Sequence, residues 1–196
     1  MIYWLYERWL ARHLTVLPEH LCFMITEGDM RDAPGKLAEV TRWCLDLGIA
    51  GVMFHISTED PSRIDPFLPF ICRVADIGEL HLHAGNPEEV MGSGSPVTVA
   101  IGSSGREEIT ACIRQMARDG VAPGDVDEGL FDHYLTFRYA PDLVIKTGQS
   151  HLTDFLIWQS VYSELFFSDV NWQYFRRVDF LRALRDYQSR KRRFGT

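Results

Sequence analysis

The chain of 196 residues ends in a basic run, Arg190 to Arg193, followed by Phe194 and Gly195. Guanidinium groups form charge-assisted hydrogen bonds with phosphate oxygens, and a glycine lets a phosphate approach the backbone closely. More arginines precede the run: Arg176, Arg177, Arg182 and Arg185. A basic cluster of this kind is usually a solvated face, and otherwise it contacts an anion or a membrane surface.

A second segment that could bind phosphate is the Gly-Ser-Ser-Gly turn at residues 102–105, which opens an expected helix. Backbone N–H groups at a helix start bind anions. The turn lacks the lysine of a P-loop and the glycine spacing of a dinucleotide-binding loop. Taken alone, it is weak support for a phosphate site.

Composition excludes several classes of protein. A net charge of −7 argues against a nucleic-acid binder. The cysteines form no Cys-x-x-Cys pair, which predicts neither a zinc site nor a disulfide framework. No apolar run reaches the roughly 20 residues of a membrane span, and no signal-peptide pattern is present. We therefore expect a cytoplasmic protein with at most peripheral membrane contact.

Strands and helices alternate along the chain. Apolar runs predict strands at 20–25, 49–56, 79–84, 96–101 and 143–145. Apolar residues at helical spacing predict helices at 2–12, 35–47, 66–75, 106–119, 153–165 and 178–191, with a further helix opened by residues 123–125 and capped by Asp125. This pattern predicts an α/β fold: a single domain over residues 1–196 with a mostly parallel central sheet of about six strands flanked by helices. The first helix, with Trp4 and Trp9, packs against the domain or contacts lipid.

Two C-terminal segments resemble a known family. Residues 141–148 and 155–169 resemble the C-terminal half of cis-prenyltransferases, the undecaprenyl and dehydrodolichyl diphosphate synthases. The resemblance implies a cis-prenyltransferase-like fold with a dimer interface at 155–172, formed by Phe155, Trp158, Tyr162, Glu164, Phe166, Asp169 and Trp172. It also implies that the tail at 190–196 acts in trans, with Arg193, Phe194 and Gly195 binding a diphosphate in the partner's site, while Glu164 approaches the partner's metal.

The N-terminal segments depart from the family. The family's Met-Asp-Gly-Asn segment, whose Asp binds Mg²⁺, corresponds to residues 25–28, and Thr26 stands at the position of that Asp. A threonine cannot supply the charge that holds Mg²⁺, so the comparison implies no catalytic residue and no metal bound by this chain alone. A slip of the alignment would bring Glu27 or Asp29 into the metal-binding role.

The diphosphate pocket of the family is also altered. Lys146, His151 and Thr153 replace two arginines and a serine that grip isopentenyl diphosphate, and lysine lacks the bidentate fork of arginine. The degraded pocket would consist of Gly28, Arg31, Arg63, Lys146, His151 and Thr153. Between Arg63 and the strand at 79–84, a long helix that walls the family's product tunnel is replaced by about 15 residues.

The retained interface and tail, together with the lost Asp, look like a non-catalytic accessory subunit of a heteromeric cis-prenyltransferase. The chain would be similar to the Nogo-B receptor, and we expect it to come from an archaeon. The partner would be a catalytic homologue in a heterodimer or heterotetramer. That partner would hold Mg²⁺ and both diphosphates and make a long-chain polyprenyl diphosphate, the precursor of carrier lipids such as dolichol. A homodimer could also form in isolation.

Two alternatives remain open. One is an active homodimeric short-chain enzyme that uses Glu27 or Asp29 as metal ligand. The other is a prenyl-diphosphate-binding regulatory protein.

Overall fold

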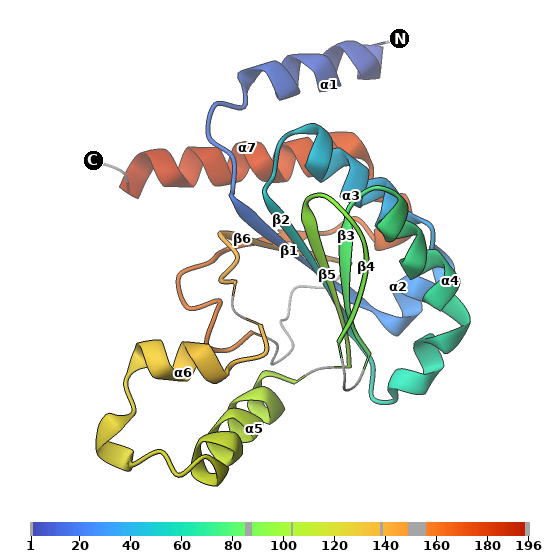
Figure 1. The fold of residues 1–196 in the computed structure, drawn as a ribbon. Helices are drawn as coiled ribbons and strands as arrows, with labels where there is room; N and C mark the ends of the chain where they lie inside the picture. The colour runs from blue at the N-terminus through green and yellow to red at the C-terminus, as the bar shows by residue number, and fades with distance from the viewer. Residues whose placement is uncertain (1, 85–87, 103, 138, 149–155, 195–196) are drawn as a thin grey trace.

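A seven-stranded sheet in the order β4-β3-β5-β2-β1-β6-β7 forms the centre of the computed structural model (Figure 1). The structure describes residues 2–84, 88–102, 104–137, 139–148 and 156–194. The strands are β1 (His20–Thr26), β2 (Gly51–Ser57), β3 (Glu79–His83), β4 (Glu89–Gly92), β5 (Pro96–Ile101), β6 (Leu143–Thr147) and β7 (Glu164–Ser168). All neighbours pair in parallel except β3 and β4, which are antiparallel.

The two faces of the sheet bury different residues. The first face carries Leu21, Phe23 and Ile25 of β1, which belong to the main hydrophobic core. The second face carries Cys22 and Met24, which belong to a smaller cluster. Because both faces are covered, the central strands are apolar throughout, as expected for parallel strands.

Helices cover both faces (Figure 1). Apolar residues of α3 (Lys36–Asp46) and α7 (Arg177–Phe194) pack in the main core on the first face. A broken segment follows β2 and covers the same face; it comprises η1 (Pro61–Phe67), α4 (Leu68–Ile71) and η2 (Cys72–Asp76). Beside the second face lie α5 (Gly105–Arg118), η3 (Pro123–Asp125) and α6 (Glu128–Tyr134). The remaining elements are α1 (Ile2–His13), α2 (Glu27–Asp32) and η4 (Trp172–Tyr174).

An aromatic cluster fills the middle of the first face. The ring centroids of Phe23 and Phe54 lie 5.3 Å apart, and Trp172 meets both rings edge-on at 6.1 and 6.4 Å. Pairs of this kind contribute about 0.5–1.5 kcal/mol each beyond simple burial. Trp172 is 0% exposed. It was predicted at a dimer interface, but its side chain lies in the core of its own chain, where that aromatic cluster encloses it.

The α/β class, the mostly parallel sheet and the flanking helices are confirmed. The expected number of strands was one too low, because β4 is short and exposed and carries little apolar pattern. The helix predicted at 66–75 is broken into η1, α4 and η2, where Pro66 interrupts the helical hydrogen bonding. Asp125 does not cap the next helix; the side chain of Asp127 does so by accepting the Leu130 N–H.

The helix predicted at 153–165 is wrong over its described part. Leu156 has a φ of 52°, and residues 157–162 form turns. The Glu164 N–H donates to the carbonyl of Asp142 at 2.9 Å, which starts the pairing of β7 with β6. Pairing with the sheet therefore replaces the helix that the apolar spacing favoured. Within the described residues, no helix is long and apolar enough to cross a membrane.

Candidate functional site

The carboxyl ends of β1, β2, β5 and β6 meet at one edge of the sheet, because these strands are parallel. Thr26, Ser57 and Lys146 lie at or next to these ends. Open parallel sheets bind ligands at this edge. The edge is therefore the candidate site, and the sequence prediction brought Thr26, Gly28, Arg31, Arg63 and Lys146 to it.

Thr26 ends β1 and caps α2. Its Oγ1 accepts the Asp29 N–H at 3.2 Å, while its own N–H and hydroxyl both donate to Asp29 Oδ2 at 2.8 Å. This capping box satisfies backbone donors at the helix start. Thr26 thus caps a helix at the position where the family resemblance places a metal ligand. The carboxylate at the start of this helix belongs to Asp29 instead.

Glu27 is held by cations. Its Oε1 lies 2.7 Å from Arg31 Nη2, and its Oε2 lies 3.6 Å from Arg63 Nη1. The Thr58 hydroxyl also donates to Oε2 at 3.1 Å. Glu27 would have to leave two guanidinium groups to bind a metal, whereas the described hydrogen bonds of the Asp29 carboxylate are both from Thr26.

Lys146 is a buried cation, with only 3% of its surface exposed. Burial lowers the pKa of its ammonium group, and the carboxylate of Asp29 partly opposes that shift. Among the described residues, the neighbouring Thr147 hydroxyl is buried without a hydrogen-bond partner. A buried charge is costly unless it is paired. This corner of the edge is therefore suited to an anion.

His55 is a polar residue that the sequence analysis missed. It is 3% exposed, lies on β2, and its Nδ1 is 3.5 Å from the Ser57 hydroxyl. A histidine inside an otherwise apolar strand was the available signal. Its position places a second nitrogen-bearing side chain beneath the same edge.

The Gly-Ser turn after β5 closes the edge beside η1. Gly102 has a φ of 65°, and a Cβ atom there would lie 2.9 Å from Cγ of Pro61. Glycine is therefore required by both backbone conformation and space. The helix start predicted here is confirmed, and Ser104 caps it by accepting the Glu107 N–H. This cap gives no further support to the phosphate site that the sequence supported only weakly.

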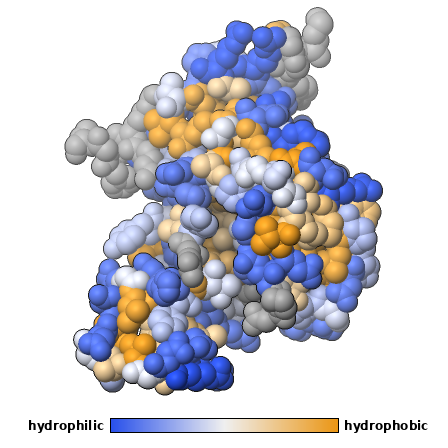
Figure 2. All heavy atoms as spheres, viewed as in Figure 1, coloured by the Kyte–Doolittle hydropathy of each residue, from blue (hydrophilic) through white to orange (hydrophobic). Residues whose placement is uncertain are grey.

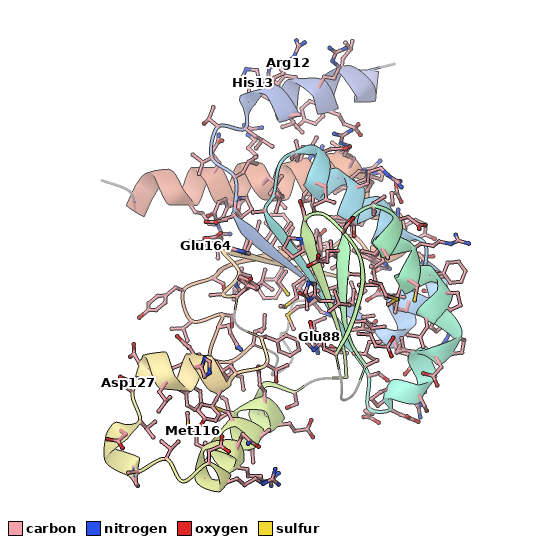
Figure 3. All side chains as sticks on the ribbon, in the orientation of Figure 1. Arg12, His13, Glu88, Met116, Asp127 and Glu164 are labelled. Atoms are coloured by element: carbon pink, nitrogen blue, oxygen red, sulfur yellow. The ribbon has the colours of Figure 1, made fainter. Side chains whose placement is uncertain are left out.

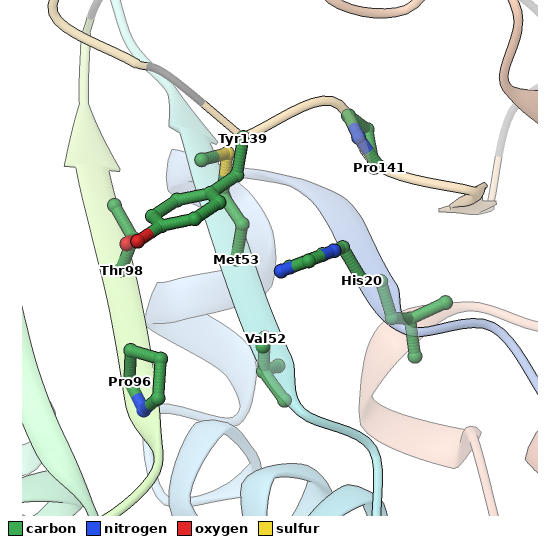
Figure 4. A pocket seen from close by; sticks show the side chains of 9 residues that line it. His20, Val52, Met53, Pro96, Thr98, Tyr139 and Pro141 are labelled. Atoms are coloured by element: carbon green, nitrogen blue, oxygen red, sulfur yellow. The ribbon is translucent and has the colours of Figure 1, made fainter.

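The first face beneath the edge is filled with protein. Val97 and Val99 of β5 lie in one core cluster with Ile64, Ile71 and Val74 of the broken segment, and all five are fully buried. Cavities do occur on the second face. One of about 20 Å³ lies between His20, Met53, Thr98 and Tyr139 (Figure 4), and one of about 510 Å³ is lined by His81, His83, Glu88 and Phe137, among others.

Several predicted residues lie away from this edge. The start of α7 lies near α2, but its C-terminal end lies on the opposite side of the molecule (Figure 1). Arg193 and Phe194 belong to α7, so the tail predicted from residue 190 begins as helix. Gly195, His151, Thr153 and Phe155 lie outside the described residues.

The described residues of the predicted interface are mostly at the surface. Tyr162 is 96% exposed and Trp158 39% exposed; Asp169 is also exposed and Phe166 is partly buried. Trp158 donates to Asp132 at 2.8 Å. Glu164, at the start of β7 (Figure 3), pairs with Arg190 at 3.2 Å. Its carboxylate is therefore engaged within its own chain.

In the part of the chain that the structure describes, no three His, Cys, Asp or Glu side chains are grouped to hold a metal ion. A single carboxylate suits Mg²⁺, because this ion commonly uses one or two carboxylates together with substrate phosphates and water. Asp29 fits that pattern better than Glu27, because Glu27 is neutralised by Arg31 and Arg63.

Comparison with known proteins gives consistent similarities. The family model of undecaprenyl diphosphate synthase matches residues 87–195. An isoprenyl transferase of Thermus thermophilus is 32% identical, with 99% of this chain and 95% of the relative covered. A tritrans,polycis-undecaprenyl-diphosphate synthase of Methanopyrus kandleri is also 32% identical, with 99% and 91% covered.

A short-chain Z-isoprenyl diphosphate synthase of Mycobacterium leprae is 33% identical, with 99% of this chain and 95% of the relative covered. Among solved structures, lavandulyl diphosphate synthase from Lavandula x intermedia has a TM-score of 0.68 at 18% identity. The match covers 88% of this chain and 95% of the synthase chain, and at this identity it shows the fold alone. These relatives come from bacteria as well as archaea, so the expected archaeal source does not follow from them. Their names are those of enzymes.

Proposed function

Because the chain belongs to the isoprenyl transferase family of undecaprenyl diphosphate synthase, we propose that it is an active prenyltransferase. In the proposed reaction, a prenyl group moves from an allylic diphosphate to isopentenyl diphosphate, releasing diphosphate and a proton. The product is short. The observation that carries this proposal is the buried Lys146 ammonium at the carboxyl edge, whose charged form the Asp29 carboxylate favours.

Lys146 supports the proposal through its burial and charge. An ammonium group at 3% exposure is stabilised when an anion binds beside it, and a diphosphate supplies that charge. Arg63 lies at the same edge with a 58% exposed side chain and can turn from Glu27 toward a phosphate. These two cations would hold and orient the diphosphates, which is the main catalytic demand of the reaction.

Asp29 is the residue that we propose to hold Mg²⁺. When bound, the ion would neutralise the departing diphosphate. Thr26 positions the Asp29 carboxylate through two hydrogen bonds to Oδ2, which still leaves lone pairs for a cation. Of the two ligands considered from the sequence, Asp29 is thus preferred to the salt-bridged Glu27.

The filled first face supports a short product. The segment between Arg63 and β3 packs on the first face, where Ile64, Ile71 and Val74 belong to the same core cluster as Val97 and Val99 of β5. A long apolar chain has no space among these residues. The M. leprae relative is named as a short-chain synthase, which supports the same product class.

A radiometric assay tests this function. The purified chain is incubated with Mg²⁺, labelled isopentenyl diphosphate and dimethylallyl, geranyl or farnesyl diphosphate, and products are separated by length. We expect products extended by one or a few units. Asp29→Asn should lower kcat by about 100-fold or more, because it keeps the cap but removes the charge. Lys146→Met should raise the KM for isopentenyl diphosphate about tenfold or more.

Glu27→Gln is the matched control for Asp29→Asn and should keep activity within about tenfold of the parent. Absence of turnover with all three allylic substrates would rule out the proposal. Equal losses in Asp29→Asn and Glu27→Gln would overturn the assignment of Asp29.

The accessory-subunit function is a second candidate, favoured by one observation: Thr26 occupies the expected metal-ligand position and is committed to a helix cap. In this case the pure chain would be inactive, and adding a catalytic homologue from the same organism would restore long-chain synthesis. Arg193→Ala in this chain should then abolish the restored synthesis. Activity of the homologue alone at its full rate would exclude this candidate.

A further inference from the structure

Helix α1 lies on the outside of the molecule, against α7 (Figure 1). Leu10 packs with Val178 and Leu181 of α7, and Tyr6, Ala11 and Leu14 border this small cluster. The inner stripe of α1 is therefore used for docking on α7. The outer surface of the same helix is left exposed.

The outer surface of α1 is apolar and aromatic. Leu5 is 57% exposed and Trp9 is 46% exposed. The rings of Tyr6 and Trp9 are stacked with centroids 6.1 Å apart, and the His13 ring lies 4.5 Å from Trp9. Figure 2 shows hydrophobic atoms over α1 and α7 next to strongly hydrophilic ones. A large exposed aromatic with a polar edge is typical of a membrane interface.

Arginines surround this aromatic surface. The guanidinium of Arg182 lies 5.6 Å from the Tyr6 ring centroid, and that of Arg185 lies 5.6 Å from the Trp9 ring centroid. Arg8 and Arg12 of α1 are also exposed, and Figure 3 places Arg12 and His13 on the outer side of the helix. This positive surface occurs on a chain of net charge −7, so the charge is concentrated rather than general.

The carboxylates nearby cancel only part of this charge, because Asp179 pairs with Arg182 and Glu7 is the single acidic residue in the sequence of α1. Asp179 is buried and accepts from Arg176 and Arg182, and Asp186 pairs with Arg190 at 2.8 Å. A second copy of the same surface would bring like charges together, so a symmetric protein contact through α1 is disfavoured. An anionic surface that also accepts Trp and Leu side chains satisfies both the charge and the apolar exposure.

We propose that the outer surface of α1, together with Arg182 and Arg185 of α7, binds the surface of a membrane that contains anionic lipids. Leu5 and Trp9 enter the boundary between headgroups and acyl chains. Arg8, Arg12, Arg182 and Arg185 lie at the level of the phosphates. The helix lies in the plane of the interface and does not cross it.

Vesicle co-sedimentation tests the proposal. The full chain is mixed at low salt with phosphatidylcholine vesicles that contain about 30% phosphatidylglycerol, or with phosphatidylcholine alone. We expect binding that is at least about tenfold stronger to the anionic vesicles and that weakens as salt is raised. Leu5→Ser with Trp9→Ser should reduce binding about tenfold or more. Arg12→Gln and Arg185→Gln should each reduce it about fivefold.

The controls come from α5, on the other side of the molecule. Ile113 is 56% exposed, nearly the same as Leu5, and Arg114 is exposed. Ile113→Ser and Arg114→Gln should leave vesicle binding unchanged. Absent binding to anionic vesicles, or equal losses in the α1 and α5 variants, would overturn the proposal. So would a dimer in sedimentation equilibrium that is lost in Leu5→Ser with Trp9→Ser.

Discussion

At the scale of single residues, the difference between a hydroxyl and a carboxylate at position 26 decides how this edge works. Thr26 gives its hydroxyl proton to Asp29 and accepts the Asp29 N–H in return. A carboxylate at position 26 could accept the N–H but could not donate. It would face the carboxylate of Asp29 across the distance that a hydrogen bond now spans.

Thr26→Asp should therefore destabilise the chain without metal and respond to Mg²⁺. Asp is a good helix cap, so the cost comes from repulsion with Asp29 and from the lost hydroxyl donor. We expect the free energy of unfolding to fall by about 1–2 kcal/mol in EDTA. Millimolar Mg²⁺ should recover most of that loss, because two carboxylates then share a cation. Urea titrations with and without Mg²⁺ measure both effects.

Thr26→Asn is the matched control, since it caps the helix and carries no charge. Its stability should not depend on Mg²⁺. A Thr26→Asp variant that is equally stable in EDTA and in Mg²⁺ would contradict this account of the edge.

At the scale of elements, the β3–β4 hairpin is tied by a histidine. His81 Nδ1 lies 2.7 Å from Glu88, and its Nε2 lies 2.9 Å from Glu79. Burial acts to lower the pKa of His81, but its hydrogen bonds and charge interactions with Glu79 and Glu88 outweigh burial and raise it. His83 lies 3.3 Å from the same Glu88 oxygen, and burial lowers the pKa of that histidine.

This tie should weaken as pH rises. The folded-state pKa of His81 lies above its unfolded value, so its contribution is fully present below about pH 6.5. It is then lost as pH rises through the folded pKa. Because the ring is 27% exposed, the effect on unfolding free energy should stay below about 1 kcal/mol. His81→Gln should flatten the stability difference between pH 5.5 and pH 8 in urea titrations. If the stability of His81→Gln depends on pH in the same way as that of the parent chain, His81 does not tie the hairpin.

The sequence predicts those helices and strands that are determined by their own residue pattern, and misses those that depend on pairing with distant segments. β1, β2, α3, α5 and α7 follow from apolar spacing, and the structure places them within a few residues of the expected bounds. β4 could not be predicted, because it is held by pairing with β3 rather than by its own pattern. The start of β7 could not be predicted either, because the hydrogen bond from the Glu164 N–H to the Asp142 carbonyl pairs this segment with β6 in place of the expected helix.

The candidate site divides in the same way. Thr26, Arg63 and Lys146 were predicted as site residues from the family resemblance, and the structure places them at the carboxyl edge. The pairing of Glu27 with Arg63 joins residues far apart in sequence, so no local pattern indicates it. The sequence analysis also missed the burial of Trp172, because aromatic residues at helical spacing occur both at interfaces and in cores.

At the scale of the whole molecule, α7 separates the tail from the edge. Its C-terminal end, which carries Arg193, lies across the molecule from α2 (Figure 1). If the tail acts on a diphosphate, we expect it to act on the site of a second chain. The exposed Tyr162 and Trp158 offer apolar surface for such an assembly.

Mixing two inactive variants tests this arrangement for the active enzyme. Asp29→Asn and Arg193→Ala should each be inactive alone. After random reassembly, half of the dimers are mixed, and each mixed dimer has one site with both intact residues. Activity should therefore recover to about a quarter of the parent value. If the mixture stays inactive although subunit exchange is shown by mass spectrometry, the tail does not act in trans.

The capping box at Thr26 has a consequence for how this protein is made. The start of α2 is completed by two side chains of the chain itself, and both are present as soon as it folds. Formation of this helix start therefore needs no cation. We expect a newly made chain to form this helix start equally well with and without Mg²⁺, because neither capping side chain depends on an ion.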